Sequence, residues 1–130
     1  MEKEFLKYTE ALALKELGFN EMCFSTFIYK VPELQWELNF VISDNRHIGT
    51  VASPTFSQAF RFFREKYNII PNIHSIYTDE THTKIEFWFW FGNYEDDSDD
   101  EVFYGTYEEA ELECLKKLIE IVKEKKNETE

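Results

Sequence analysis

The spacing of hydrophobic side chains along the chain predicts three helices and four to five strands. Apolar residues that recur every three or four positions predict helices over residues 3–17, 53–68 and 106–126. Two-residue alternation, or a dense run of strand formers, predicts strands over residues 22–30, 35–43, 69–78 and 84–91, with a short last strand over 102–104. The order α-β-β-α-β-β-(β)-α predicts an α+β fold, in which helices cover one face of an antiparallel sheet of four to five strands.

The helix predicted from residue 53 onward has the most complete set of signals. Ser53 is expected to cap this helix, and Pro54 to be its first residue, where the missing N–H of proline costs nothing. Its apolar stripe consists of Phe56, Ala59, Phe60, Phe63 and Tyr67. The preceding residues 44–52 are expected to form a loop. The last helix opens with Thr106 and Glu109, which are spaced as in a capping box.

The strand predicted over residues 84–91 has the strongest strand pattern, and it carries two tryptophans. Ile85, Phe87, Phe89 and Phe91 share one face, whereas Trp88 and Trp90 share the other. If the Phe face packs on the helices, both tryptophans face outward on the open side of the sheet. A monomer seldom exposes such a patch without a use for it, and Trp is enriched at interfaces. Two interpretations stay open: a loop or helix of the same chain covers the two rings, or they contact a protein partner, a second copy in a homodimer, or a planar ligand.

Length and charge limit the domain organisation and the partners. With 130 residues, we expect a single α+β domain over residues 1–126 and a frayed tail over 127–130. The net charge of −12 is uneven, because residues 1–92 hold 9 Lys/Arg and 12 Asp/Glu whereas residues 93–130 hold 5 and 14. This charge disfavours nucleic acid and suits a basic protein partner. The exception is a local basic spot formed by Arg61, Arg64 and Lys66.

The sequence does not predict a membrane protein. The longest unbroken apolar run is Phe87–Phe91, which is five residues, far below the roughly 20 needed to cross a bilayer. Residues 1–10 mix charged and bulky side chains and do not resemble an apolar signal sequence. The widely separated Cys23 and Cys114 are interpreted as free buried thiols in a reducing compartment. We therefore expect a cytoplasmic protein with no membrane contact.

Most classes of catalysis lack the residues that their chemistry requires. The four glycines are scattered, so they form no phosphate-binding loop. The two cysteines fall within strand and helix patterns and have no partner base in the sequence. His47 is interpreted as a solvated loop histidine beside Asp44 and Arg46, with a role as base or anion ligand as the alternative. No catalytic residue is assigned and no cofactor is expected.

Two further groups of polar residues are candidate ion sites. His74 and His82 flank a predicted hairpin turn, where they would face each other and bind a divalent ion together with Asp79 or Glu80. The acidic run at 95–101 includes Asp96, Asp97, Asp99 and Asp100. Such a run would bind Ca²⁺, or would mimic a nucleic-acid backbone in a basic groove of a partner, but a solvated loop is the favoured interpretation.

Three segments of the chain resemble a known family. They are A-L-A-L-K-E-L-G-F-N-E at 11–21, P-T-F-S followed by R-F-F-R-E-K-Y-N-I at 54–69, and Y-E-E-A-E-L-E-C-L-K-K-L-I at 107–119. Together they are similar to a family of small uncharacterised proteins of gut-bacterial phages and prophages. The chain departs from the family's pattern by having Phe62 and Phe63 where a Trp-Leu pair is usual, and by its acidic run. The resemblance implies an accessory protein in a bacterial cytoplasm, and it assigns no catalytic residue.

Three hypotheses about function follow. The first is a non-enzymatic accessory protein that binds a host macromolecule, such as a defence factor, through Trp88, Trp90 and the acidic run. The second is a binder of a small planar ligand such as a nucleotide, with Arg61 or Arg64 on its phosphate. The third, ranked last, is a metal-dependent enzyme that uses His74 and His82.

Overall fold

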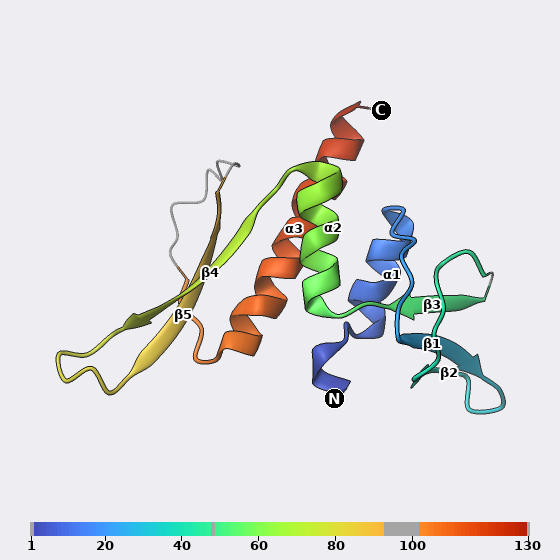
Figure 1. The fold of residues 1–130 in the computed structure, drawn as a ribbon, viewed down its shortest axis with the longest axis horizontal. Helices are drawn as coiled ribbons and strands as arrows, with labels where there is room; N and C mark the ends of the chain where they lie inside the picture. Colours follow the sequence, from blue (N-terminus) through green and yellow to red (C-terminus); the bar gives the residue numbers. More distant parts are fainter. Residues whose placement is uncertain (1, 48, 93–101, 130) are drawn as a thin grey trace. The chain divides into compact units, whose positions relative to one another are not determined.

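A computed structural model describes residues 2–47, 49–92 and 102–129 (Figure 1). The elements follow in the order η1 (Glu2–Glu4), α1 (Tyr8–Glu16), β1 (Ser25–Lys30), β2 (Gln35–Asn39), β3 (Thr50–Ser53), α2 (Phe56–Tyr67), β4 (Pro71–Tyr77), β5 (Ile85–Phe91) and α3 (Tyr107–Thr129). The α+β class and the broad order of helices and strands are therefore confirmed. None of the described helices is both long and apolar enough to cross a membrane.

The chain forms two compact units, Met1–Ala59 and Phe60–Glu130, and the division falls inside α2. Its strands form two separate antiparallel sheets, one in each unit, with orders β2-β1-β3 and β4-β5. The prediction of one sheet with four to five strands is wrong in this respect. The residue pattern located four of the five described strands, but such a pattern indicates only which face of a strand is buried and not which strands pair.

The first unit is built around β1, the central strand of its sheet. β1 pairs with β2 from Thr26 opposite Asn39 to Lys30 opposite Gln35, and with β3 from Ser25 opposite Ser53 to Ile28 opposite Thr50. Helix α1 lies against β3. An aromatic cluster covers part of the sheet, in which the rings of Tyr8 and Trp36 are stacked with centroids 4.8 Å apart.

Strand β3 was not predicted, because residues 44–52 were expected to form a loop. Asn45 holds the start of this segment in place: its Oδ1 accepts from the N–H of Ala52 at 2.9 Å, and its Nδ2 donates to the carbonyl of Phe19 at 2.9 Å. The hydroxyl of Ser53 is buried and donates to the carbonyl of Leu6 at 2.6 Å. Ser53 therefore ends a strand and does not cap α2, so the predicted cap is wrong.

Helix α2 begins at Phe56, two residues after Pro54, the predicted first residue, and Thr55 is its cap. The N–H of Gln58 donates to the Thr55 hydroxyl at 3.2 Å, and the N–H of Thr55 donates to the Gln58 side-chain oxygen at 3.0 Å. This reciprocal pair is a capping box. The helix ends where Asn68 adopts a left-handed conformation, with φ 54°, which suits the short polar side chain of Asn. Phe62, which lies off the predicted stripe, is buried together with Phe63.

The second unit contains the β4–β5 hairpin and α3, which lies along it (Figure 1). The strands pair from Pro71 opposite Phe91 to Tyr77 opposite Ile85. Beyond the acidic run, the short strand predicted over 102–104 is reduced to one bridge, in which Tyr104 exchanges both backbone hydrogen bonds with Phe87 at 2.7 and 2.8 Å. The N–H of Glu109 donates to the Thr106 hydroxyl at 3.1 Å, as the capping box predicts.

Helix α3 covers one face of the β4–β5 hairpin. The ring of Phe87 makes an edge-on contact with Tyr107, at a centroid distance of 5.9 Å, and Phe91 is buried. The apolar stripe of α3 is buried along its length, as shown by Ala110, Cys114, Leu115, Leu118, Ile119, Ile121 and Val122. Its backbone remains helical through Thr129, beyond the residue where fraying was expected. The opposite face of the hairpin carries the tryptophans.

Candidate functional site

The register of the hairpin brings Trp88, Trp90 and His74 together on the face turned away from α3. His74 lies directly opposite Trp88, and Asn72 lies opposite Trp90. Side chains alternate between the two faces of a strand, so these residues are on the face opposite to Phe87 and Phe91. We call Trp88, Trp90 and His74 the tryptophan face.

The three rings of the tryptophan face form a continuous stack. The imidazole of His74 lies 5.2 Å from the Trp88 ring, with 28° between the planes, and 5.8 Å from the Trp90 ring, with 10° between the planes. Ring pairs at such separations attract each other beyond the effect of area burial alone. The stack therefore holds both indole rings in fixed orientations on the sheet.

The tryptophan face is partly open to solvent. Trp90 is 43% exposed and His74 is also exposed, whereas Trp88 is half-buried. Ile76, on the same face of β4, is 43% exposed. At the other margin Glu86 is paired with Lys84, with 3.3 Å between Oε1 and Nζ. The surface is thus a partly exposed aromatic and aliphatic patch with the Lys84–Glu86 ion pair at its edge.

The two histidines proposed as metal ligands do not lie together. His74 stacks on the tryptophans, whereas His82 stacks on Tyr77, with ring centroids 4.8 Å apart. His74 and Tyr77 are three positions apart on β4, so their side chains lie on opposite faces of the hairpin. The two imidazoles therefore contact rings on different faces. Among the residues that the structure describes, no group of three or more His, Cys, Asp or Glu side chains could hold a metal ion.

Asp79, the other proposed ligand beside His82, organises the hairpin turn. Its carboxylate accepts hydrogen bonds from the hydroxyls of Thr81 and Thr83 and from the backbone N–H groups of Thr83 and Lys84. These bonds, that of the Thr83 hydroxyl foremost, hold the pKa of Asp79 far below its usual value. Both oxygens of the carboxylate therefore accept hydrogen bonds from the turn itself.

The remaining predicted binding residues lie elsewhere. Arg61 and Arg64 are both exposed on α2, a different element from the tryptophan face. Asp96, Asp97, Asp99 and Asp100 lie outside the described residues. The sequence places them directly after β5, which ends at Phe91.

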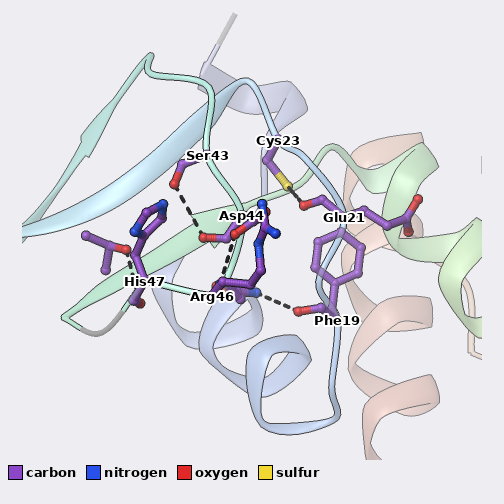
Figure 2. Close-up of polar contacts among 9 residues, drawn as sticks. Phe19, Glu21, Cys23, Ser43, Asp44, Arg46 and His47 are labelled. Atoms are coloured by element: carbon purple, nitrogen blue, oxygen red, sulfur yellow. Dashed lines mark hydrogen bonds and ion pairs between the residues drawn. The ribbon is translucent and has the colours of Figure 1, made fainter.

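The loop in which His47 was considered as a base or anion ligand forms a polar cluster around Asp44 (Figure 2). The buried carboxylate of Asp44 accepts from the backbone N–H of Arg46 at 2.9 Å and from its Nε at 2.8 Å. The hydrogen bond from the Arg46 N–H, reinforced by the guanidinium, lowers the pKa of Asp44. His47 is exposed, and its carbonyl accepts from the Thr50 hydroxyl at 3.5 Å. Asp44 is thus a weak base committed to Arg46, and the cluster shapes the loop before β3.

Neither cysteine has the properties of a nucleophile. Cys23 and Cys114 are both buried, and burial raises the pKa of each thiol to about 12. Because the thiolate is the reactive form, both side chains remain unreactive at neutral pH. The Cys23 thiol points to the carbonyl of Glu21, at 3.5 Å (Figure 2). These positions fit the interpretation of the cysteines as core residues.

His74 is the part of the tryptophan face that the sequence pattern did not indicate. It was considered only as a metal ligand, yet its ring is the centre of the aromatic stack. The signal was present, because a hairpin turn between Tyr77 and Ile85 sets His74 opposite Trp88. Counting back from the turn would have found this pair.

Comparisons with protein-family models, with curated proteins and with solved structures found no match to this chain.

Proposed function

We propose that this protein is an accessory protein of phage or prophage type that acts without catalysis, by binding a protein of the bacterial host through its tryptophan face. The setting rests on the resemblance of residues 11–119 to proteins of gut-bacterial phages. The mode of action rests on the stack of Trp88, His74 and Trp90 on the partly exposed face of the β4–β5 hairpin. A host factor that takes part in defence is the partner class we favour.

The physical argument is that this surface has the properties of a binding hot spot. Trp anchors carry a large share of the energy at protein interfaces, mainly when their rings are held rigidly before the partner arrives. His74 provides that rigidity, since it stacks on both indoles. Burying the exposed part of Trp90 and Ile76 would remove apolar surface from water, at about 25 cal/mol for each Å².

The charge of the chain indicates the kind of protein that would bind. The net charge of −12 repels nucleic acid and attracts a basic protein surface. The acidic run that follows β5 in the sequence adds to this preference. We therefore expect a partner with an apolar patch bordered by Lys or Arg, and we expect association to slow as the salt concentration rises.

The test compares proteins captured from a bacterial lysate by three forms of the chain: wild type, Trp88→Ala/Trp90→Ala, and a control. The control is Val31→Ala/Leu34→Ala, which removes two side chains that are 74% and 68% exposed in the first unit. We expect at least one host protein to be retained by the wild type and the control, and its yield to fall at least about tenfold with the tryptophan variant.

Circular dichroism of all three forms would first establish that each is folded. If the tryptophan variant retains the same proteins as the wild type, or if the wild type retains none, the proposal is wrong. A host protein lost equally from the tryptophan variant and the control would place the contact elsewhere, and would also contradict it.

A further inference from the structure

The outer edge of β4 carries backbone groups that no described strand pairs. Phe87 exchanges both of its backbone bonds with Tyr104, on the side of β5 away from β4. The N–H and C=O groups alternate in direction along an antiparallel strand. The backbone groups of Trp88 therefore point toward β4, where they bond with the backbone of His74. Ser75, which lies opposite Phe87, must then point its N–H and C=O away from β5.

The same alternation applies along the whole of β4. Ile73 and Tyr77 each lie two positions from Ser75, so their N–H and C=O groups also point away from β5. Pro71 follows the same spacing, and it has no N–H to offer, as is usual for proline on an edge strand. Among the described strands β4 pairs with β5 alone. Within the part of the chain that the structure describes, the edge thus presents a ladder of unpaired N–H and C=O groups at residues 73, 75 and 77.

This edge lacks the charges that usually protect an exposed strand. The segment Pro71–Tyr77 reads P-N-I-H-S-I-Y and contains no Lys, Arg, Asp or Glu, in a chain with 26 acidic and 14 basic residues. Side chains from His74 to Tyr77 are exposed, with Tyr77 at 53%. By contrast, the edge strand β2 of the other sheet carries Glu37. Long uncharged edges are templates for pairing with another chain.

We propose that β4 pairs antiparallel with β4 of a second copy of this chain, about a two-fold axis at Ser75. The two hairpins then form one four-stranded sheet in the order β5-β4-β4-β5. Ser75 bonds with its own counterpart, and Ile73 bonds with Tyr77 of the second copy, so that all three outward residues are satisfied. This gives about six backbone hydrogen bonds, and Pro71 falls outside the ladder.

Self-complementarity identifies a second copy as the occupant. In this register Ile73 lies beside Tyr77 of the second copy, which is a favourable aromatic and β-branched pair. On the other face His74 lies beside Ile76 of the second copy, so the tryptophan face continues across the axis. β4 contains no Asp, Glu, Lys or Arg, so the pairing brings no like charges together. A strongly acidic chain can pair with itself only through such an uncharged strand. This inference does not depend on the proposed host partner.

The variants Ser75→Pro and Ser75→Ala distinguish loss of pairing at the edge of β4 from loss of the hairpin fold. Ser75→Pro removes an N–H that points away from β5, so it leaves the β4–β5 bonds intact, whereas Ser75→Ala keeps that N–H. Mass would be followed by sedimentation equilibrium from about 10 μM to 1 mM, a range suited to a small interface. We expect the wild type and Ser75→Ala to approach twice the 15.7 kDa chain mass, and Ser75→Pro to stay at the mass of one chain.

Charged variants at position 75 test the register of the dimer. They also test the proposal independently of whether Ser75→Pro folds. Ser75→Glu and Ser75→Lys each place like charges directly opposite each other, so each alone should be monomeric, whereas their mixture should form a dimer. Amide exchange of the wild-type dimer should show added protection at Ile73, Ser75 and Tyr77, and little change at Asn72, His74 and Ile76. A monomeric wild type, a dimer indifferent to proline at position 75, or a mixture that stays monomeric would each overturn the proposal.

Discussion

Ser53 and Thr55 show how a single residue takes its role from tertiary pairing. Both are followed by good helix signals: Ser53 precedes a proline, and Thr55 precedes Gln58 by three positions. The sequence favoured Ser53, but the Ser53 hydroxyl is buried against the carbonyl of Leu6, 47 positions away. Local propensity could not reveal this bond, since it exists only once β3 has joined the sheet. Thr55 is left to cap α2.

The role of Thr55 leads to a prediction about stability. Thr55→Ala should lower the free energy of unfolding by about 1 kcal/mol, because the N–H of Gln58 loses its acceptor. Thr55→Ser keeps the hydroxyl and should lose much less. Ser57→Ala is the matched control, since Ser57 is exposed in the first turn of the same helix. Urea unfolding followed by circular dichroism measures all three, and an equal loss for Thr55→Ala and Ser57→Ala would contradict the assignment of the cap.

At the scale of elements, the sequence predicted the strongly patterned segments and missed the one with little pattern. The bounds of β4 and β5 agree with the predicted 69–78 and 84–91 to within two residues, because both segments contain β-branched or aromatic strand formers and flank a run of turn residues. Strand β3 has four residues, T-V-A-S, too few for alternation to appear. Its position depends on Asn45, which accepts a hydrogen bond from Ala52 within the same segment, and on Ser25, which donates to Ser53 from 28 positions away.

The candidate site was predicted in part, for the same reason. The pairing of Trp88 and Trp90 on one face follows from strand parity alone. Which face is covered depends on α3, and the contribution of His74 depends on register, so neither could be fixed by composition. The sequence also offered His74 and His82 as a candidate ion site across the turn, although it was ranked last among the hypotheses. They do not meet, because Asp79 and the two threonines fold the turn so that His82 reaches Tyr77.

The turn of the β4–β5 hairpin leads to a prediction about pH. The pKa of Asp79 is lowered in the folded state, so its ionised form stabilises the hairpin above the unfolded value of 3.8. That contribution is lost as the pH falls below 3.8, because the unfolded chain then binds a proton that the folded turn excludes. Asp79→Ala removes the contribution at every pH, so the variant should be less stable than the wild type at pH 7.

The experiment is a comparison of wild type and Asp79→Ala between pH 7 and pH 2.5, with amide exchange of Lys84 and the adjoining strand residues as the readout. We expect faster exchange in the variant at pH 7 and a smaller difference at low pH. Glu80→Ala is the control, since Glu80 is the exposed neighbour in the same turn. A difference between wild type and Asp79→Ala that does not shrink on acidification would show that the charge of Asp79 is not the cause.

At the scale of the whole molecule, the division into two units raises the question of cooperativity. The units are Met1–Ala59 and Phe60–Glu130, so the boundary cuts the twelve-residue α2 into four and eight residues. Isolated helices shorter than about 12–15 residues are marginal in water, because nucleation is costly and each later residue adds only one bond. Neither fragment of α2 would persist alone, so loss of one unit should destabilise the start or end of the other.

We therefore predict one unfolding transition for the whole chain, and the tryptophans allow each unit to be followed separately. Trp36 belongs to the first unit, and Trp88 and Trp90 belong to the second. Trp36→Phe leaves fluorescence from the second unit alone, and Trp88→Phe/Trp90→Phe leaves it from the first. In each variant the urea midpoint from fluorescence should coincide with that from circular dichroism, which reports helices of both units. This comparison is made within one variant, so any stability change caused by the substitution cancels. Fluorescence that precedes circular dichroism in one variant and follows it in the other would show that the units unfold independently, and that the expected single domain is in fact two.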